Sequence, residues 1–217
     1  MDRTITIKGT GNLKIKPDYI QLNFSLVSKN FQYERAMNIA SESLEKLYNA
    51  IINVGFEKDD VKTRYFDVST DYDSVKDKYG NYKKVFRGYK VNHKLILSFD
   101  YDMKKLSNAL IAISTSLSDP DLSIDFTIKD SEKAKYDLLK EVAIDARKKA
   151  EILCEASGYK LGDLIKIDYD WSEITIFSNT KFSMLREQSI MTASKSIDMN
   201  PEDIDLEDTA TFVWEIK

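Results

Sequence analysis

The sequence predicts an α+β fold, with a mixed, largely antiparallel sheet and packed helices. Segments with an apolar side chain at every second position alternate with segments in which apolar side chains recur every three or four positions, the periods of strands and helices. Several strand segments follow one another across short turns, which favours antiparallel pairing. The chain of 217 residues is 42% hydrophobic, so it can bury a core, and we expect a single domain over residues 1–217.

Periodicity places the expected elements in order. They are strands at 4–15 and 19–28, a helix at 33–54, strands at 61–72 and 86–100, a helix after Asp102, a strand at 122–128, a helix at 131–157, and strands at 164–177 and 209–217. Residues 178–200 lack a clear period and predict a mobile insertion. The longest stretch without a charged residue, 106–118, has 13 residues, well short of the ~20 apolar residues that span a bilayer, so no transmembrane segment is expected.

Gly9 and Gly11 lie inside the first expected strand. A dinucleotide-binding fingerprint needs a third glycine and a helix directly afterwards, but here a second strand follows. The two glycines therefore predict a bulge or bend in the strand.

The first and the longest helix are expected to end in the same way. Gly55 followed by Phe56, and Gly158 followed by Tyr159, are typical of a glycine cap with a hydrophobic residue that folds back on the helix. A polar turn and an alternating strand follow each pair. The sequence therefore indicates a weak helix-to-strand repeat.

The longest helix also carries a stripe of small side chains. Ala143, Ala146 and Ala150 recur at steps of three and four, so they predict a close-packed helix face that another element approaches. The basic residues between them are matched by acidic residues, which is typical of a solvated face and not of a nucleic-acid stripe.

The chain is poor in the residue types that carry out catalysis. Cys154 is its only cysteine and His93 its only histidine, which excludes a disulfide within the chain and a zinc site of the Cys/His type. We expect Cys154 to be buried and inert. His93 shares one side of a strand with apolar residues and is expected to be packed or interfacial, although its ordinary pKa near neutrality leaves a pH-sensing role open.

We assign no catalytic residue, no cofactor and no metal site from the sequence. Asp71, Asp73 and Asp77 resemble the start of a calcium-binding loop, but Val75 holds its third ligand position and Tyr82 stands where the bidentate glutamate should be. A second acidic run, at 198–208, predicts a solvated turn, with weak cation binding left open. The N-terminus enters an alternating strand almost at residue 1, without the apolar core of a signal peptide, and the single cysteine fits a reducing compartment, so we expect a cytoplasmic protein.

The segment at 70–91 is the most unusual part of the chain, because aromatic and basic residues are interleaved in it. Gly80-Asn81 predicts a two-residue hairpin turn, and pairing outward from this turn sets Val75 opposite Phe86. A two-stranded ribbon of this length is marginal in water, so its aromatic residues are expected to cover another surface. The residues predicted to make this contact are Tyr72, Tyr79, Tyr82, Phe86 and Tyr89.

Five motifs follow one another in an order that resembles a known family. They are ITIKGTGNLKIKPDYIQLNFSL, GFEKDDVKTRYFDVSTDYD, GYKVNHKLILSF, AIDARKKAEILCEASGYKLGDLIKI and NPEDIDLEDTATFVWEIK. Together they resemble the SIMPL-domain family, which includes periplasmic immunogenic and oxidative-stress-defence proteins of bacteria. The resemblance covers nearly the whole chain. It implies an α+β fold that tends to self-assemble and a role linked to stress or to the cell envelope, and it implies no catalytic residues.

These observations leave three hypotheses for function. The first is a non-enzymatic scaffold that forms a homo-oligomer, with any other protein partner unknown. The second is a module that binds a ligand or single-stranded nucleic acid through the aromatic hairpin, against which the net charge of −4 argues. The third is an enzyme with an unidentified carboxylate site, since the 36 Asp and Glu residues show no spacing that selects a pair.

Overall fold

In a computed structural model, the described residues are 3–76, 79–116, 121–170, 174–184 and 200–217. The chain forms two compact units: unit 1 comprises residues 1–18, 127–179 and 201–217, and unit 2 comprises residues 19–126 and 180–200. The predicted α+β class is confirmed, but the strands form two antiparallel sheets instead of one.

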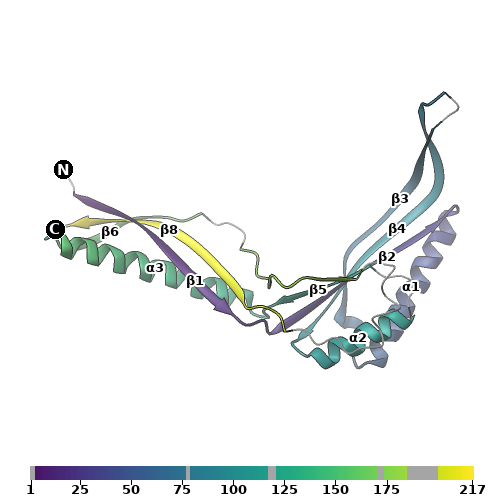
Figure 1. The fold of residues 1–217 in the computed structure, drawn as a ribbon, viewed down its shortest axis with the longest axis horizontal. Helices are drawn as coiled ribbons and strands as arrows, with labels where there is room; N and C mark the ends of the chain where they lie inside the picture. Colours follow the sequence, from purple (N-terminus) through teal and green to yellow (C-terminus); the bar gives the residue numbers. More distant parts are fainter. Residues whose placement is uncertain (1–2, 77–78, 117–120, 171–173, 185–199) are drawn as a thin grey trace. The chain divides into compact units, whose positions relative to one another are not determined.

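The helices and strands follow one another along the chain in the order shown in Figure 1. They are β1 (Thr4–Ile15), β2 (Tyr19–Asn30), α1 (Tyr33–Asn53), the short 3-10 helix η1 (Lys58–Asp60), β3 (Val61–Lys76), β4 (Tyr82–Asp100), α2 (Met103–Ser116), β5 (Asp121–Thr127), α3 (Ser131–Ala156), β6 (Leu161–Asp168), β7 (Phe182–Met184) and β8 (Ile204–Ile216).

Unit 1 is a three-stranded antiparallel sheet, in the order β1-β8-β6, with α3 packed along one face (Figure 1). Every fourth residue of α3 from Ala134 to Cys154 is buried, and because residues four apart are neighbours on a helix surface, they form one continuous stripe. Most contacts of α3 are with β1. Its buried residues pack against apolar side chains of β1 and β8, among them Ile7, Ala210, Phe212 and Trp214.

Gly9 and Gly11 make room for this helix. The strand β1 pairs with β8 in one unbroken register, so the predicted bulge at the two glycines is wrong. A Cβ on Gly11 would lie 2.6 Å from the backbone oxygen of Leu138, and one on Gly9 would overlap the backbone oxygen of Val142. The glycines are therefore the positions where the α3 backbone lies directly on the strand.

Unit 2 is a five-stranded sheet, in the order β3-β4-β2-β5-β7, whose core is shared with α1 and α2. Alternate residues of β2 and β4, including Leu22, Phe24, Leu95 and Leu97, face this core. The helices contribute Leu47 and further apolar residues at helical spacing. The core therefore follows directly from the two periods in the sequence.

Both predicted glycine caps are present. Gly55 and Gly158 adopt φ values of +88° and +76°, a region that favours glycine. The amides of Phe56 and Tyr159 each donate to the backbone oxygen five residues earlier, at 3.1 and 2.9 Å. Each helix then leads into a strand at the edge of its sheet, β3 in unit 2 and β6 in unit 1.

The predicted strand at 164–177 is too long. The strand β6 ends at Asp168, and Ile174 and Ile176 instead pack beside α3 residues such as Leu138 without pairing in a sheet. The alternation of Ile174 and Ile176 with polar residues therefore reflects the burial of these two side chains and not hydrogen-bonded pairing with another strand. The expected insertion at 178–200 contains the short strand β7, and most of the rest lies outside the described residues. Among the helices described, none is long and apolar enough to cross a bilayer.

Candidate interaction surface

The strands β3 and β4 continue beyond the rest of their sheet. The last residue of β2, Asn30, pairs with Tyr89, so residues 71–76 and 82–88 pair only with each other within the described part of unit 2. Figure 1 shows this two-stranded extension, which we call the ribbon. It corresponds to the hairpin predicted at 70–91.

The register of the ribbon differs from the prediction. Val75 pairs with Lys83, whereas Phe86 pairs with Tyr72. Lys76 and Tyr82 are the last partners, so the strands are joined by a five-residue connection and not by a two-residue turn. The dipeptide Gly80-Asn81 lies at the end of this longer connection. The left-handed conformation of Gly80 (φ +86°) occurs in longer loops as well as in tight turns, so the dipeptide alone does not fix the length of the turn.

A β-bulge marks the base of the ribbon. Asp71 pairs with Gly88 but the next residue, Tyr72, pairs with Phe86, which leaves Arg87 as the extra residue. Gly88 is buried with φ +129°, and a Cβ there would overlap the backbone oxygen of Asn30. Only glycine fits at this point, where the ribbon leaves the sheet.

The predicted aromatic residues divide into two groups. Phe86 lies in edge-to-face contact with Tyr72 and Tyr89, at centroid distances of 5.6 Å for both pairs. Two residues near the start of α1 complete this base cluster, Phe31 at 5.4 Å from Phe86 and Tyr33 at 5.5 Å from Tyr89. These two were not predicted, because their contacts depend on how α1 meets β4 and not on any local pattern.

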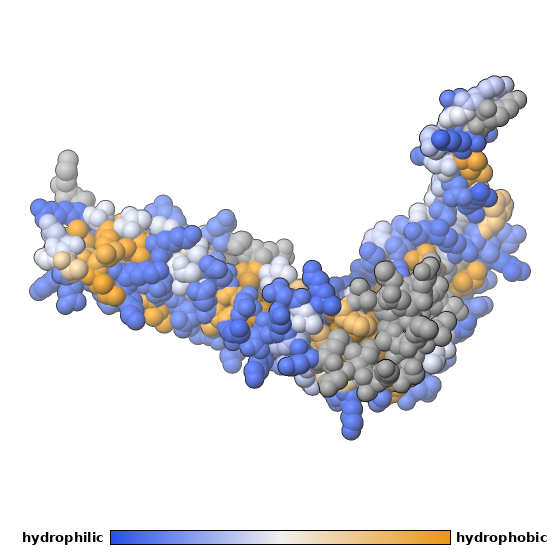
Figure 2. Space-filling model, viewed as in Figure 1, coloured by the Kyte–Doolittle hydropathy of each residue, from blue (hydrophilic) through white to orange (hydrophobic). Residues whose placement is uncertain are grey.

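Tyr79 and Tyr82 form the second group, toward the tip. Their side chains are 77% and 71% exposed. The Lys76 ammonium lies 5.3 Å from the centre of the Tyr82 ring, and Val75 and Val85 are exposed on the same ribbon. Figure 2 shows the ribbon as a largely hydrophilic surface with a small hydrophobic area. The tip therefore presents aromatic, apolar and cationic groups together.

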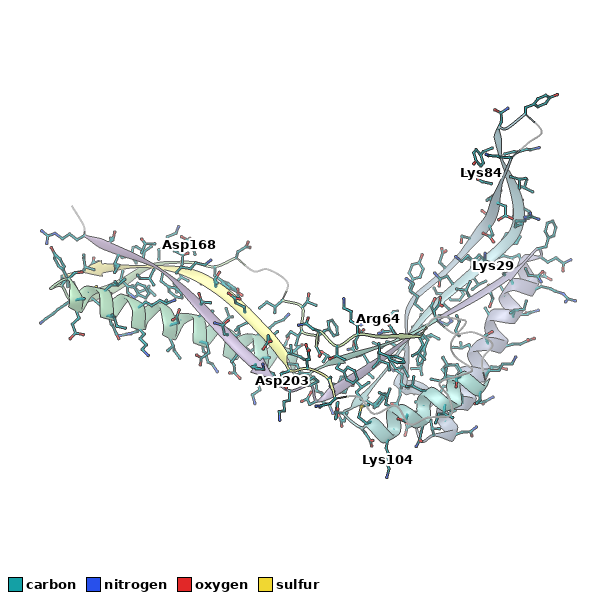
Figure 3. The ribbon with its side chains drawn as sticks, in the orientation of Figure 1. Lys29, Arg64, Lys84, Lys104, Asp168 and Asp203 are labelled. Atoms are coloured by element: carbon teal, nitrogen blue, oxygen red, sulfur yellow. The ribbon has the colours of Figure 1, made fainter. Side chains whose placement is uncertain are left out.

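The charge of the ribbon is mainly positive. Asp71 and Asp73 accept bonds from Lys29 and Arg87 at 2.8 and 2.7 Å, and the hydrogen bond from Lys29 lowers the pKa of Asp71. Lys76, Lys83 and Lys84 add further cations, of which Lys84 is labelled near the tip in Figure 3. Such a surface can recognise an acidic or aromatic partner.

His93 lies on the sheet below the ribbon and is packed. Its Nε2 is 2.9 Å from the Thr63 hydroxyl oxygen, and its ring meets Phe66 edge to face at 5.1 Å. Burial lowers the pKa of His93, so the neutral imidazole is the favoured form at neutral pH. The arrangement provides a hydrogen-bonded structural histidine without a carboxylate or thiol partner among the described residues.

The other residues singled out in the sequence lie in unit 1. Cys154 is buried on α3. Ala146 and Ala150 are buried in the contact with β1 and β8, whereas Ala143 is exposed and lies outside that contact. The helix period explains the difference, since Val142 and not Ala143 lies one turn before Ala146. Within the described residues, no group of three potential ligands could hold a metal ion.

A comparison with protein families shows which family the chain is similar to. The family model SIMPL, described as a protein of unknown function (DUF541), matches residues 5–214, which is nearly the whole chain. No curated protein matches the sequence.

Proposed function

The chain belongs to the SIMPL family, and from this premise we propose that it is a non-enzymatic protein that assembles with copies of itself through the ribbon. The observation that carries the proposal is the exposure of Tyr79 and Tyr82 on a two-stranded extension. An isolated two-stranded ribbon gains little stability from its own contacts, so a protein surface that covers it accounts for its length.

The aromatic base cluster gives the ribbon a firm attachment. Phe86 contacts residues of β3, β4 and the segment before α1, so the ribbon is anchored where it leaves the sheet. An anchored ribbon loses less conformational entropy on binding than a flexible loop does. Its carboxylates are engaged by Lys29 and Arg87, which supports a role in contact and not in proton transfer.

The experiment is to shorten the ribbon at its observed register. Asp73 and Val85 are cross-strand partners, so replacing residues 74–84 with Asn-Gly joins them by a two-residue hairpin turn. We expect the trimmed protein to fold but to show a lower mass by light scattering coupled to size exclusion. An unchanged oligomer would contradict the proposal, as would a full chain that is strictly monomeric.

A substitution pair provides the matched control. The double variant Tyr79→Ala/Tyr82→Ala should weaken assembly, because it removes the exposed rings of the ribbon. Tyr136→Ala removes another exposed tyrosine, on α3 and away from the ribbon, and should leave the mass unchanged. Equal effects of the two would point to a general loss of surface tyrosine and not to the ribbon.

The second candidate is binding of single-stranded nucleic acid, favoured by the Lys76–Tyr82 contact beside Lys83 and Lys84. Such binding needs stacking rings with cations that neutralise phosphates. A titration with a labelled single-stranded oligonucleotide at two salt concentrations tests it. Binding that weakens with salt and disappears in Tyr82→Ala would favour this function over assembly.

A further inference from the structure

The two edges of the sheet in unit 1 differ. On the β1 edge, side chains of α3 occupy two neighbouring outward backbone groups: the Thr10 amide donates to the Asp145 carboxylate at 2.7 Å, and the Lys149 ammonium donates to the Lys8 backbone oxygen at 3.5 Å. Lys149 also pairs with Asp145 at 2.6 Å. The hydrogen bonds from Lys149 and Thr10 lower the pKa of Asp145, so the carboxylate stays ionised. The helix thereby blocks the middle of this edge, at Lys8 and Thr10, against another strand.

The β6 edge carries no such block within the described residues. The strand has β8 as its one neighbour in the sheet, and none of the described side chains bonds to the outward backbone of Leu161–Asp168. Leu164, Ile165 and Ile167 are 48%, 52% and 52% exposed. Figure 2 shows hydrophobic surface in the region where β6 and the C-terminal part of α3 lie in Figure 1. A free edge with exposed apolar side chains is a template for a further strand.

The charges on β6 identify the strand that fits. Lys166 and Asp168 lie on the same side and pair at 2.7 Å, with Ile167 between them on the other side, opposite Phe212 of β8. If a second β6 runs antiparallel with Ile167 opposite itself, each Lys166 faces Asp168 of the other copy. In this register the opposite charges of the two copies face each other. The two-fold symmetry repeats the Lys166–Asp168 pair on either side of Ile167.

We propose that β6 of one copy pairs with β6 of a second copy, antiparallel, about a two-fold axis at Ile167. The proposal rests on self-association, as the proposed function does, but it uses a different surface. The register shifts in β6 all precede Lys166, so the regular stretch from Lys166 to Asp168 sets the pairing. The contact buries Ile167 of one copy against Ile167 of the other. It joins the two three-stranded sheets into one sheet of six strands.

Cross-linking tests the register directly. The background is the ribbon-trimmed chain with Cys154→Ala, so that the only thiol is the one introduced and the ribbon cannot hold copies together. Directly opposed residues of antiparallel strands have Cα atoms ~4.5–5.5 Å apart, within disulfide range. Under mild oxidation, Ile167→Cys should form a covalent dimer. Ile144→Cys, at a site 59% exposed on α3, should form none.

Charge exchange provides a second test in the same background. Lys166→Asp places like charges opposite each other and should convert the dimer to monomer by light scattering. Lys166→Asp/Asp168→Lys restores opposite charges in the proposed register and should restore the dimer. Circular dichroism and a thermal melt show that each variant is folded.

The outcomes distinguish this inference from the proposed role of the ribbon. A dimeric trimmed chain that cross-links through Ile167→Cys supports the β6 contact, whether or not the ribbon adds a further contact. A trimmed chain that is monomeric without a cross-link overturns the β6 contact, even where the full chain assembles. Equal cross-linking of Ile167→Cys and Ile144→Cys would overturn the β6 contact as well, since it would show that the disulfides form by random collision between monomers.

Discussion

Gly9 of β1 lies directly against Ala146 of α3, so that a Cβ on Gly9 would come within 2.7 Å of the Ala146 Cβ. Real Cβ atoms do not approach so closely, and the nearest other atom is the Val142 backbone oxygen, which cannot move without shifting the helix. The close packing of α3 on its sheet therefore requires a glycine at position 9 of β1 and a side chain as small as alanine at position 146 of α3.

Gly9→Ala is expected to destabilise unit 1. The added methyl group pushes α3 away from β1, at a cost of about 1–3 kcal/mol for an overpacked core. A urea melt followed by circular dichroism measures this as a lower midpoint. Thr6→Ala, on an exposed position of the same strand, is the control and should change the midpoint little. Equal midpoints for Gly9→Ala and wild type would mean that the helix packs more loosely than the structure shows.

Ala146→Leu is expected to overpack the same contact by enlarging the side chain on α3. Ala146 is fully buried, so the larger side chain should cost about 1–3 kcal/mol of unfolding free energy. Ala143→Leu makes the same change three residues earlier on the same helix, at an exposed position, and is expected to be close to neutral. Thermal unfolding of the two variants side by side measures the difference, and identical melting temperatures would contradict the assigned face of α3.

Tyr169 is expected to ionise at unusually high pH. Its hydroxyl donates to the Asp208 carboxylate at 2.6 Å, and this bond raises the pKa of Tyr169 to about 12. Because the folded pKa lies above the ordinary value of 10, the stabilisation is complete below pH 10 and is lost as the pH rises from 10 to about 12. The difference in tyrosinate absorbance between wild type and Tyr169→Phe isolates this group.

Asp208→Asn is the matched variant for this titration. It keeps an acceptor beside the phenol but removes the negative charge, so the pKa of Tyr169 should fall toward its ordinary value. A Tyr169 titration that is the same with and without the Asp208 charge would mean that the hydrogen bond does not persist in solution.

Cys154 should react with a thiol reagent only when the protein unfolds. It is the one cysteine of the chain, and its side chain is buried on α3. The labelling rate should therefore follow the unfolded fraction across a urea titration. Cys154→Ala/Ile152→Cys moves the thiol to an exposed position of the same helix and should label at once. Rapid labelling of the native wild type would contradict the burial of Cys154 and would favour a redox role for this thiol.

Local chemistry in the chain determined where the helices and most strands lie. Gly55 and Gly158 end their helices because a left-handed residue there lets the next amide reach back to the helix, a relation that spans only a few residues. Asp102 and Asp130 begin helices by accepting the amide three residues later, at 2.9 Å in both cases. Such signals are complete within one segment, so they can be predicted without knowledge of its neighbours.

Tertiary structure decided how the segments meet. A shift in register exchanges one set of cross-strand partners for another without changing the alternation of the sequence. The sequence therefore predicts Phe86 as the partner of Val75, whereas the structure pairs Val75 with Lys83. Gly9 predicts a bulge from the sequence, because a glycine within a strand is compatible both with a bulge and with the close approach of a helix. The base cluster at Phe31 and the block of the β1 edge by Asp145 also join residues far apart in sequence. Long-range packing alone selects these pairs, because no local energy favours one distant partner over another.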